Sequence, residues 1–299
     1  MNKSSKVMSV LIPSFRHFAL ILGSLWLAAS PTAASDSLAT LDWTLAETLV
    51  ALGESPDGVA QVGDYHSWVG EPRLPSRVTD IGLRTQPNVE LLARMAPEHI
   101  LLTPMFAHLT PRLSRIGTVD SMALYTPGDD TWEQILGLTR ELGELNGDRE
   151  SAEALISSTE ARMAELAAQL PATVPPLLIV QFMDERHVRV FGENGLFQAV
   201  MDRLGLENAW QGETNSWGFS LVALEALLEL EARLVVVEPY PAGVEAKLAE
   251  SALWQHHPSV RDDSLITLPP TWSFGALPSA QRFAELLVNA LVRPMLGNL

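Results

Sequence analysis

The chain has 299 residues and no cysteine, and its 36 acidic residues outnumber 20 basic ones, giving a formal net charge of −16 at pH 7. This negative charge argues against partners such as nucleic acid or anionic lipid surfaces, which would repel the protein. The lack of cysteine excludes disulfides, thiol nucleophiles and Cys-ligated metals. A chain of this length can bury a sufficient core without them, as two lobes or as one large α/β domain.

Residues 1–34 have the order of a secretory signal peptide. Lys3, Lys6 and Arg16 precede the apolar run "FALILGSLWLAA", and the small residues "SPTAAS" follow it. The alternative, a membrane anchor, needs roughly 18 to 20 apolar residues, more than this run supplies. We therefore predict an exported protein cleaved near Ala34, whose loss of the three basic residues changes the formal net charge from −16 to −19.

Helical and strand patterns alternate along the rest of the chain. Apolar residues at helical spacing predict helices at residues 44–53, 88–96 and 196–205. Short apolar runs predict buried strands at residues 99–103, 177–183 and 234–239. This alternation is typical of α/β proteins, so we predict parallel-type sheets flanked by helices.

One longer helix is predicted in the middle of the chain. Residues 146–170 contain no proline, their apolar residues follow helical spacing, and "PATVPP" ends the pattern. About 24 helical residues would span roughly 36 Å. The helix would either connect an N-terminal α/β lobe (35–145) to a C-terminal α/β lobe (171–299), or be an ordinary surface helix of one domain.

An internal repeat favours two lobes. The segment "ELLARMAPEHILLTP", which begins at Glu90, aligns without a gap with "EALLELEARLVVVEP", which begins at Glu225. Each copy predicts a helix followed by a strand, although such pairs are common enough for chance to remain an alternative. Ligands of open parallel sheets bind beyond the carboxyl ends of strands, so we expect a site just after Thr103 and Glu238.

Familiar catalytic and metal-binding motifs are missing from the sequence. It contains no G-x-S-x-G, no G-x-x-x-x-G-K-[ST] and no G-x-G-x-x-G. Its histidines form no His-x-x-x-His or His-x-His pair. A hydrolase that uses other acidic residues remains an alternative, but no residue pattern points to it.

Tryptophans in polar segments are the most unusual feature. Four of them stand in polar segments or near Pro or Gly: Trp43, Trp68, Trp217 and Trp272. Each could be a core residue, but together they predict an aromatic-walled pocket in which a ligand covers the rings. In "NAWQGETNSWGFS" we expect this of Trp217, with Trp210 as a second candidate.

Arg84 lies in "DIGLRTQPNVELL" among uncharged neighbours. It could pair with Asp80 in a purely structural role. In an aromatic cleft, its guanidinium would instead offer a planar fork of hydrogen-bond donors to ligand oxygens.

The stretches "IGLRTQPNVELL" and "NAWQGETNSWGFS" resemble the periplasmic ferric hydroxamate-binding proteins of bacterial iron importers, which belong to the helical-backbone class of substrate-binding proteins. The similarity covers nearly the whole mature chain. It implies two α/β lobes joined by one long helix. It also implies a monomeric, non-enzymatic periplasmic receptor without a cofactor, which captures ferric hydroxamate siderophores and delivers them to an inner-membrane ABC permease.

The resemblance also implies roles for particular residues. The family's hydroxamate-binding arginine corresponds to Arg84, and its pocket aromatics correspond to Trp43, Trp68, Trp217 and Trp272. Phe106 and Phe274 stand where relatives have pocket tyrosines, so the pocket keeps its rings but loses two hydroxyl groups. Glu90 and Glu225 match the acidic residues that contact arginines of the permease, although exposed glutamates at helix starts are also favoured by the helix dipole.

Charge distinguishes between classes of iron chelate. Three hydroxamates neutralise Fe³⁺, whereas a tris-catecholate complex carries a charge of −3 and would need several basic side chains. The sequence predicts one isolated arginine, Arg84, near its aromatics, which favours hydroxamates. Six ligand oxygens already enclose the iron, so the protein needs no metal ligands of its own. A receptor for a corrinoid or haem is the alternative within binding proteins.

Overall fold

The structure, a computed structural model, describes residues 37–296. The predicted signal peptide lies outside these residues. Within them, no helix combines the length and the apolar character needed to cross a membrane.

Five parallel strands form the N-terminal sheet, in the order β3-β2-β1-β6-β7. Its strands are β1 (Leu38–Thr40), β2 (Gly58–Val59), β3 (Thr79–Asp80), β6 (His99–Leu102) and β7 (Thr118–Ser121). Its helices are α1 (Trp43–Ala51), α2 (Val62–Trp68), α3 (Val89–Met95), the 3-10 helix η1 (Pro104–Leu109) and α4 (Thr110–Leu113). A separate hairpin, β4 (Gly82–Leu83) and β5 (Gln86–Pro87), follows β3.

Five further strands form the C-terminal sheet, in the order β10-β9-β8-β11-β12, in which β8, β11 and β12 are parallel and β9 and β10 are antiparallel. Its strands are β8 (Leu177–Phe182), β9 (His187–Phe191), β10 (Phe219–Ala223), β11 (Arg233–Val237) and β12 (Ile266–Leu268). Its helices are α7 (Leu196–Leu204), the 3-10 helix η2 (Leu224–Glu229), α8 (Val244–Glu250), α9 (Ala252–His256) and α10 (Pro258–Arg261).

The predicted α/β class is confirmed, and the repeat occupies matching places in both sheets. The predicted strands at 99–103 and 234–239 are β6 and β11, and each is the fourth strand of its sheet. The helix before β6 is α3, which begins after Asn88, whose side chain accepts a hydrogen bond from the Leu91 N–H. The helix before β11 is only the short 3-10 helix η2.

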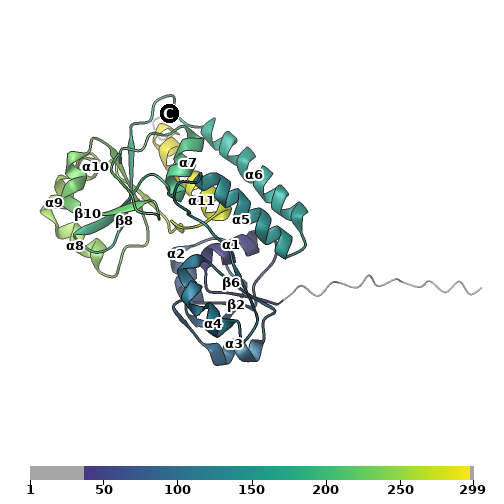
Figure 1. The fold of residues 1–299 in the computed structure, drawn as a ribbon. Coiled ribbons are helices and arrows are strands. Elements are labelled where there is room, and N and C mark those ends of the chain that lie inside the picture. The colour runs from purple at the N-terminus through teal and green to yellow at the C-terminus, as the bar shows by residue number, and fades with distance from the viewer. Residues whose placement is uncertain (1–36, 297–299) are drawn as a thin grey trace, which may run out of the picture. The chain divides into compact units, whose positions relative to one another are not determined.

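Three helices connect the sheets: α5 (Thr131–Leu145), α6 (Arg149–Ala167) and α11 (Leu277–Leu296). The helix predicted at 146–170 is α6, which starts later because Asp148 is its N-cap and accepts a hydrogen bond from the Ser151 N–H at 2.9 Å. It lies beside α5, α7 and α11 (Figure 1), so it is one helix of a layer and not an isolated connecting helix. We propose that residues 35–145 and 171–299 form the two lobes on either side of it.

One hydrophobic core is shared by both sheets. Alternate strand residues face opposite sides of a sheet. Leu38 of β1 and Leu177 of β8 therefore reach a common core with α1, α5, α6, α7 and α11. The opposite faces are covered separately, by α3 and η1 on the N-terminal sheet and by α8 and α9 on the C-terminal sheet. Continuous packing of this kind resists separation of the lobes, because interiors are as dense as organic crystals.

A buried carboxyl group adds a polar contact between α1 and α11. Glu47 is completely buried and accepts hydrogen bonds from the Ala276 N–H at 2.7 Å and from the Ser279 hydroxyl. Gly275 permits this approach, because a Cβ there would lie 2.5 Å from Glu47 Oε1. Burial raises the pKa of Glu47 to about 8, so the group is mostly neutral at pH 7.

The raised pKa of Glu47 predicts a pH-dependent stability. Between the ordinary pKa of 4.5 and about 8, the folded state holds a proton here that the unfolded state has lost. The free energy of unfolding should therefore fall as pH rises through this window, by up to about 1.4 kcal/mol per pH unit. Glu47→Gln, which mimics the protonated acid, should remove most of this decline. Denaturant unfolding at pH 5.5, 7 and 8.5 measures the free energy of unfolding of both proteins. An equal decline with pH in both would contradict the raised pKa of Glu47.

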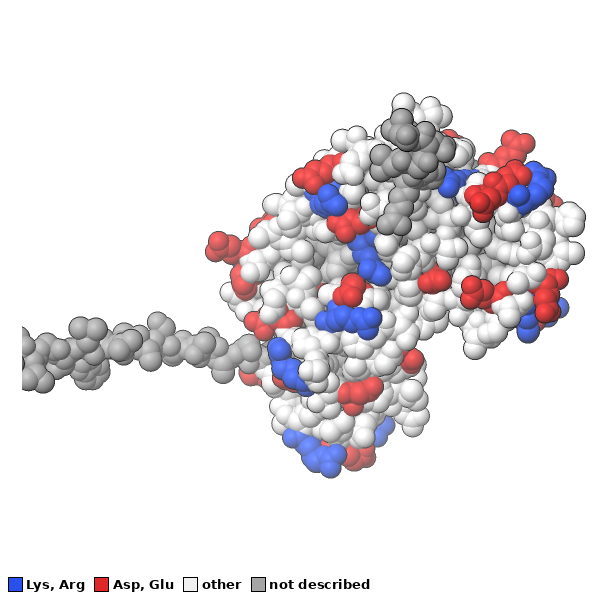
Figure 2. All heavy atoms as spheres, turned by 180° about the vertical axis from the view of Figure 1, so that it is seen from behind, with Lys and Arg blue, Asp and Glu red and all other residues white. Residues whose placement is uncertain are grey.

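Charged side chains on the surface are mixed in sign. On the face shown in Figure 2, acidic groups are spread widely, and basic groups lie singly or in small groups beside them. Basic residues that line a cavity therefore stand out from this background.

Candidate functional site: an aromatic cavity between the sheets

A cavity of about 650 Å³ is lined by residues of both proposed lobes. The N-terminal part contributes side chains from α1, α2, the β4–β5 turn and η1, and the C-terminal part contributes Arg189, Ser216, Trp217, Trp272 and Phe274. Thr103 and Pro104, which follow β6, lie in this lining, at the predicted carboxyl end of the strand, whereas the residues just after Glu238, which were also expected there, do not line it. This volume is in the range of small-molecule sites, roughly 300–1,000 Å³.

The structure brings all four predicted tryptophans to this cavity: Trp43, Trp68, Trp217 and Trp272. Trp272 lies between Trp43 and Phe274, with ring centroids 5.0 and 5.2 Å away. Trp43 and Trp272 are 4% and 8% exposed, whereas Trp68 and Trp217 are half-buried and present more of their rings. The indole N–H groups of Trp43 and Trp272 donate to Ala60 O and Thr44 Oγ1, so these side chains offer ligands an apolar surface.

Local turn chemistry explains the polar composition around Trp217. The Asn215 side chain accepts a hydrogen bond from the Trp217 N–H at 2.9 Å. Gly218 has a φ of 73°, and a Cβ there would lie 2.2 Å from the backbone of Gly195. These constraints hold the loop and leave the indole in the cavity. Trp210 is a different case, since it lies outside the cavity and packs against the core on the other side of the C-terminal sheet.

Arg84 lies in the turn between β4 and β5 and points to the N-terminus of α1. Its Nε donates to Leu41 O at 3.0 Å, and its Nη2 lies 3.4 Å from Asp42 Oδ2. Asp42 also caps α1 through the Thr44 N–H. The alternative partner Asp80 instead accepts hydrogen bonds from the Gly82 N–H at 2.8 Å and from the Val62 N–H, at the start of α2, at 3.0 Å.

The surroundings of Arg84 combine ring faces with a counter-charge. Its guanidinium carbon lies 4.5 Å from the ring centroid of Trp43, 5.1 Å from that of Phe106 and 5.5 Å from that of Trp272. Burial lowers the pKa of Arg84 and Asp42 opposes this, so the group stays protonated. Among residues 37–296, two of its five N–H donors are used, which leaves donors for ligand oxygens.

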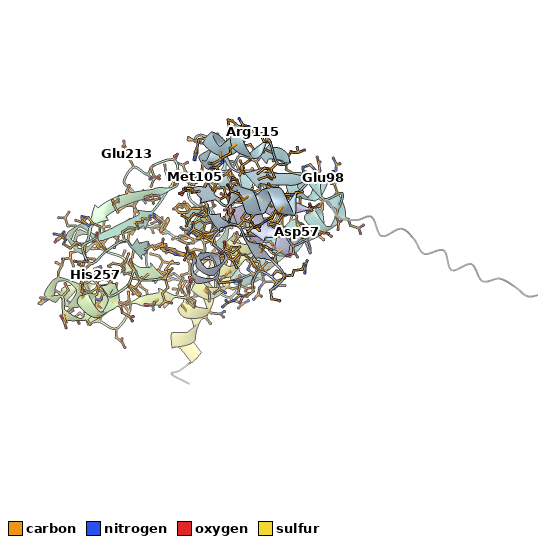
Figure 3. All side chains as sticks on the ribbon, turned by 90° about the horizontal axis from the view of Figure 1, so that it is seen from below. Asp57, Glu98, Met105, Arg115, Glu213 and His257 are labelled. Atoms are coloured by element: carbon orange, nitrogen blue, oxygen red, sulfur yellow. The ribbon has the colours of Figure 1, made fainter. Side chains whose placement is uncertain are left out.

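Phe106 is placed differently from the other predicted site residues. It is 1% exposed, belongs to the core under the N-terminal sheet and does not line the cavity. Its neighbour Met105, which sequence analysis overlooks, lines the cavity and is 46% exposed (Figure 3). Contact of Phe106 with a ligand stays a prediction. In this structure the ring packs against the guanidinium of Arg84.

A second arginine corrects the expectation of one isolated arginine near the aromatics. Arg189 of β9 lines the cavity and lies over Phe219 and Phe274, with centroid distances of 4.9 and 5.5 Å. The pattern "HVRVF" could have indicated it, since alternation turns an arginine between two valines away from the core. Tyr125 was also missed; it lines the cavity and its hydroxyl donates to Gly275 O at 2.6 Å.

Glu90 and Glu225 lie outside the cavity lining. Both are exposed, Glu90 in the first turn of α3 and Glu225 in the first turn of η2. Neither forms an ion pair with a described side chain. They are therefore free to contact another molecule.

Chemically, the cavity offers ring faces together with guanidinium donors. Within residues 37–296, no group of three or more potential metal ligands is placed to hold a metal ion. A bulky ligand with an apolar body and oxygen acceptors fits such a lining.

These features define a two-lobed ligand-binding protein with its site between the sheets. The sequence profile described as "periplasmic binding protein" matches residues 38–271, and the chain belongs to that family of substrate-binding proteins. The iron(3+)-hydroxamate-binding protein FhuD of Escherichia coli is 33% identical over 256 residues, which cover 85% of this chain and 86% of that protein.

Solved structures show the same fold. The Fe³⁺–Desferal-bound siderophore-binding protein FhuD of Vibrio cholerae superposes with a TM-score of 0.82 at 29% identity, covering 87% of this chain and 98% of that one. The triscatecholate siderophore-binding protein FeuA of Bacillus subtilis has a TM-score of 0.71 at 18% identity, covering 88% and 94%. The second likeness concerns the fold alone.

Proposed function

We propose that the protein is a periplasmic receptor that captures ferric hydroxamate siderophores and delivers them to an inner-membrane ABC permease. The observation that carries this proposal is the cavity between the sheets, where indole rings surround a guanidinium with free N–H donors. The similarity to hydroxamate-binding and Desferal-bound relatives supports it. We include in the proposal export by the N-terminal signal peptide, a monomeric state and a role in capture rather than catalysis.

Each part of the cavity has a counterpart in a ferric trihydroxamate complex. The complex is neutral, and the Arg84–Asp42 pair is neutral as well, so no net charge is buried between them. The remaining N–H donors of Arg84 suit the hydroxamate oxygens, which carry partial negative charge. Indole faces suit the apolar backbone of the chelator, at roughly 25 cal/mol per Å² of apolar surface buried. The iron stays within the six oxygens of its own chelator.

Binding should involve little movement of the lobes. The shared core and the Glu47 contact join α1 to α11 directly, and the Thr44 hydroxyl donates to Phe274 O at 2.7 Å. Phe274 lies in the cavity lining, so this contact fixes part of the site as well as the lobes. We propose that the receptor binds by filling a largely preformed cavity.

Glu90 and Glu225 are our candidates for permease docking. They are exposed, begin the two sequence copies of the repeat and precede β6 and β11, which have the same position in the two sheets. One acidic group on each proposed lobe would let a permease with two basic sites recognise both lobes at once. Because neither residue lines the cavity, docking would use a surface separate from the ligand site.

Tryptophan fluorescence tests the proposed ligand class. Addition of ferrichrome at micromolar concentration should quench the emission saturably, because Trp68 and Trp217 line the cavity with partly exposed rings. Haem, a corrinoid and the iron-free chelator are the comparison ligands. Tighter binding of haem or a corrinoid than of ferrichrome, or no saturable response to ferrichrome, would refute the proposal.

A further inference from the structure

We infer that the cavity prefers ferric hydroxamate chelates that carry an additional anionic group, and that Arg189 binds this group. The inference rests on the proposed function and narrows its ligand class. A simple trihydroxamate complex is neutral and needs one set of donors, which Arg84 supplies. Arg189 is a second cation in the same cavity, and a neutral ligand would leave its charge without a partner.

The position of Arg189 follows from the strand pattern of the C-terminal sheet. In β9, Val188 and Val190 are buried in the core beneath α8 and α9, so Arg189 faces the other side. Its direct cross-strand neighbours are Gln181 of β8 and Leu221 of β10. The central place of β9 between two strands fixes the direction of the side chain, and that direction leads into the cavity.

The two arginines differ in how their charges are balanced. Arg84 has a carboxylate partner, Asp42, whose side chain is 6% exposed. Arg189 donates a hydrogen bond of 3.4 Å from its Nη1 to Gln181 Oε1, and no described carboxylate forms an ion pair with it. Burial lowers the pKa of Arg189, but the group remains charged.

A half-buried cation without a counter-ion favours an anionic ligand group. Removing a charge from water costs free energy unless a partner of opposite sign is provided. The ring faces of Phe219 and Phe274 offset only part of this cost. Within the part of the chain that the structure describes, four of the five N–H donors of Arg189 remain for a carboxylate, which guanidinium binds in a bidentate manner.

The other charged groups of the lining orient such a ligand. Besides the Arg84–Asp42 pair and Arg189, the described lining contains one charged residue, Asp64 of α2. Asp64 is exposed and belongs to the N-terminal part of the site, where Gln61 donates to it. An anionic group would be repelled there and attracted to Arg189. The chelate core would therefore face Arg84, with its carboxylate directed toward β9.

Three ligands with one chelate core test this inference. Iron(III) desferrioxamine B carries a terminal ammonium group, its N-acetyl derivative is neutral at that position, and its N-succinyl derivative carries a carboxylate there. Dissociation constants are measured by tryptophan quenching at low salt. We expect the succinyl derivative to bind about tenfold more tightly than the acetyl derivative, the scale of one hydrogen bond to a charged group.

Variants assign this preference to Arg189. The ratio of the two dissociation constants should fall close to one in Arg189→Gln and be partly retained in Arg189→Lys, which keeps the charge without the planar fork. Arg233→Gln is the matched control, because Arg233 is also a half-buried arginine of the C-terminal sheet but lies outside the cavity lining. The control should keep the ratio of the unmodified protein.

The outcomes separate this inference from the proposed function. Equal binding of the acetyl and succinyl derivatives, or a ratio unchanged by Arg189→Gln, would overturn the role of Arg189 while hydroxamate binding stands. If none of the three complexes binds, the proposed function fails and the inference fails with it. A preference that weakens at high salt would support an electrostatic origin, because the ligand group and the guanidinium are then screened.

Discussion

Arg84→Ala is expected to weaken the binding of ferrichrome at least tenfold. The substitution removes the N–H donors that face the cavity, and one hydrogen bond to a charged group contributes roughly 1.5 to 3 kcal/mol. It also leaves the carboxylate of Asp42 buried with only neutral donors, chiefly the Thr103 hydroxyl at 3.0 Å and the Thr44 N–H at 2.8 Å. Both effects act against a ligand whose oxygens carry partial negative charge. The dissociation constant is measured by tryptophan quenching.

Two further variants separate ligand recognition from loss of structure. Arg84→Lys keeps a positive charge beside Asp42 but lacks the planar fork, so its affinity should lie between those of the unmodified protein and Arg84→Ala. Arg233→Ala removes an arginine outside the cavity lining and should bind as the unmodified protein does. Circular dichroism checks that each variant is folded. Unchanged affinity in folded Arg84→Ala would remove Arg84 from the site.

Replacement of Glu90 and Glu225 together by Ala is expected to abolish iron uptake while leaving ligand binding intact. The two carboxylates lie outside the cavity lining and form no ion pair with described side chains, so their loss should not alter the site. A docking contact needs both lobes, and the single variants should each lose part of the activity. Uptake of radioactive iron from ferrichrome in cells lacking their own receptor measures the effect.

A matched pair of surface glutamates controls for the loss of two negative charges. Glu160 of α6 and Glu250 of α8 are exposed helix residues outside the repeat, and their double replacement by Ala should leave uptake unchanged. Normal uptake in the Glu90 and Glu225 double variant would end the docking proposal. Impaired quenching by ferrichrome in that variant would show that these residues act on the site instead.

The elements that sequence analysis predicted are those whose signals are local. Helix α7 has an amphipathic pattern and a glycine, Gly205, at its end with a φ of 68°. The runs that became β6, β8 and β11 are continuous and apolar, as expected for strands covered on both faces. Each of these features can be recognised within about ten residues of sequence.

The features that were missed depend on contacts between distant segments. Arg84 pairs with Asp42 rather than Asp80, because the β4–β5 turn folds against the start of α1. Alternation within β9 turns Arg189 away from the core, but the cavity on that side is completed by residues distant in the chain, such as Trp217 and Phe274. A local pattern cannot predict which of these segments will meet.

Two neighbouring residues of η1 also show that the direction of a side chain could not be predicted from the sequence. The family resemblance leads to Phe106 as a pocket residue, but Met105 lines the cavity and Phe106 faces the core. The direction of a side chain in a short 3-10 segment is set by the packing around it. Here the ring of Phe106 packs against Arg84, with 5.1 Å between its centroid and the guanidinium carbon.

The most direct measurement of the central claim is the position of the iron in a crystal of the protein grown with ferrichrome. An anomalous difference map at the iron edge should show one peak inside the cavity, with chelate oxygens within hydrogen-bond distance of Arg84 and the chelator against Trp217 and Trp272. An iron peak outside the cavity, or an empty cavity under conditions where ferrichrome binds in solution, would contradict the account.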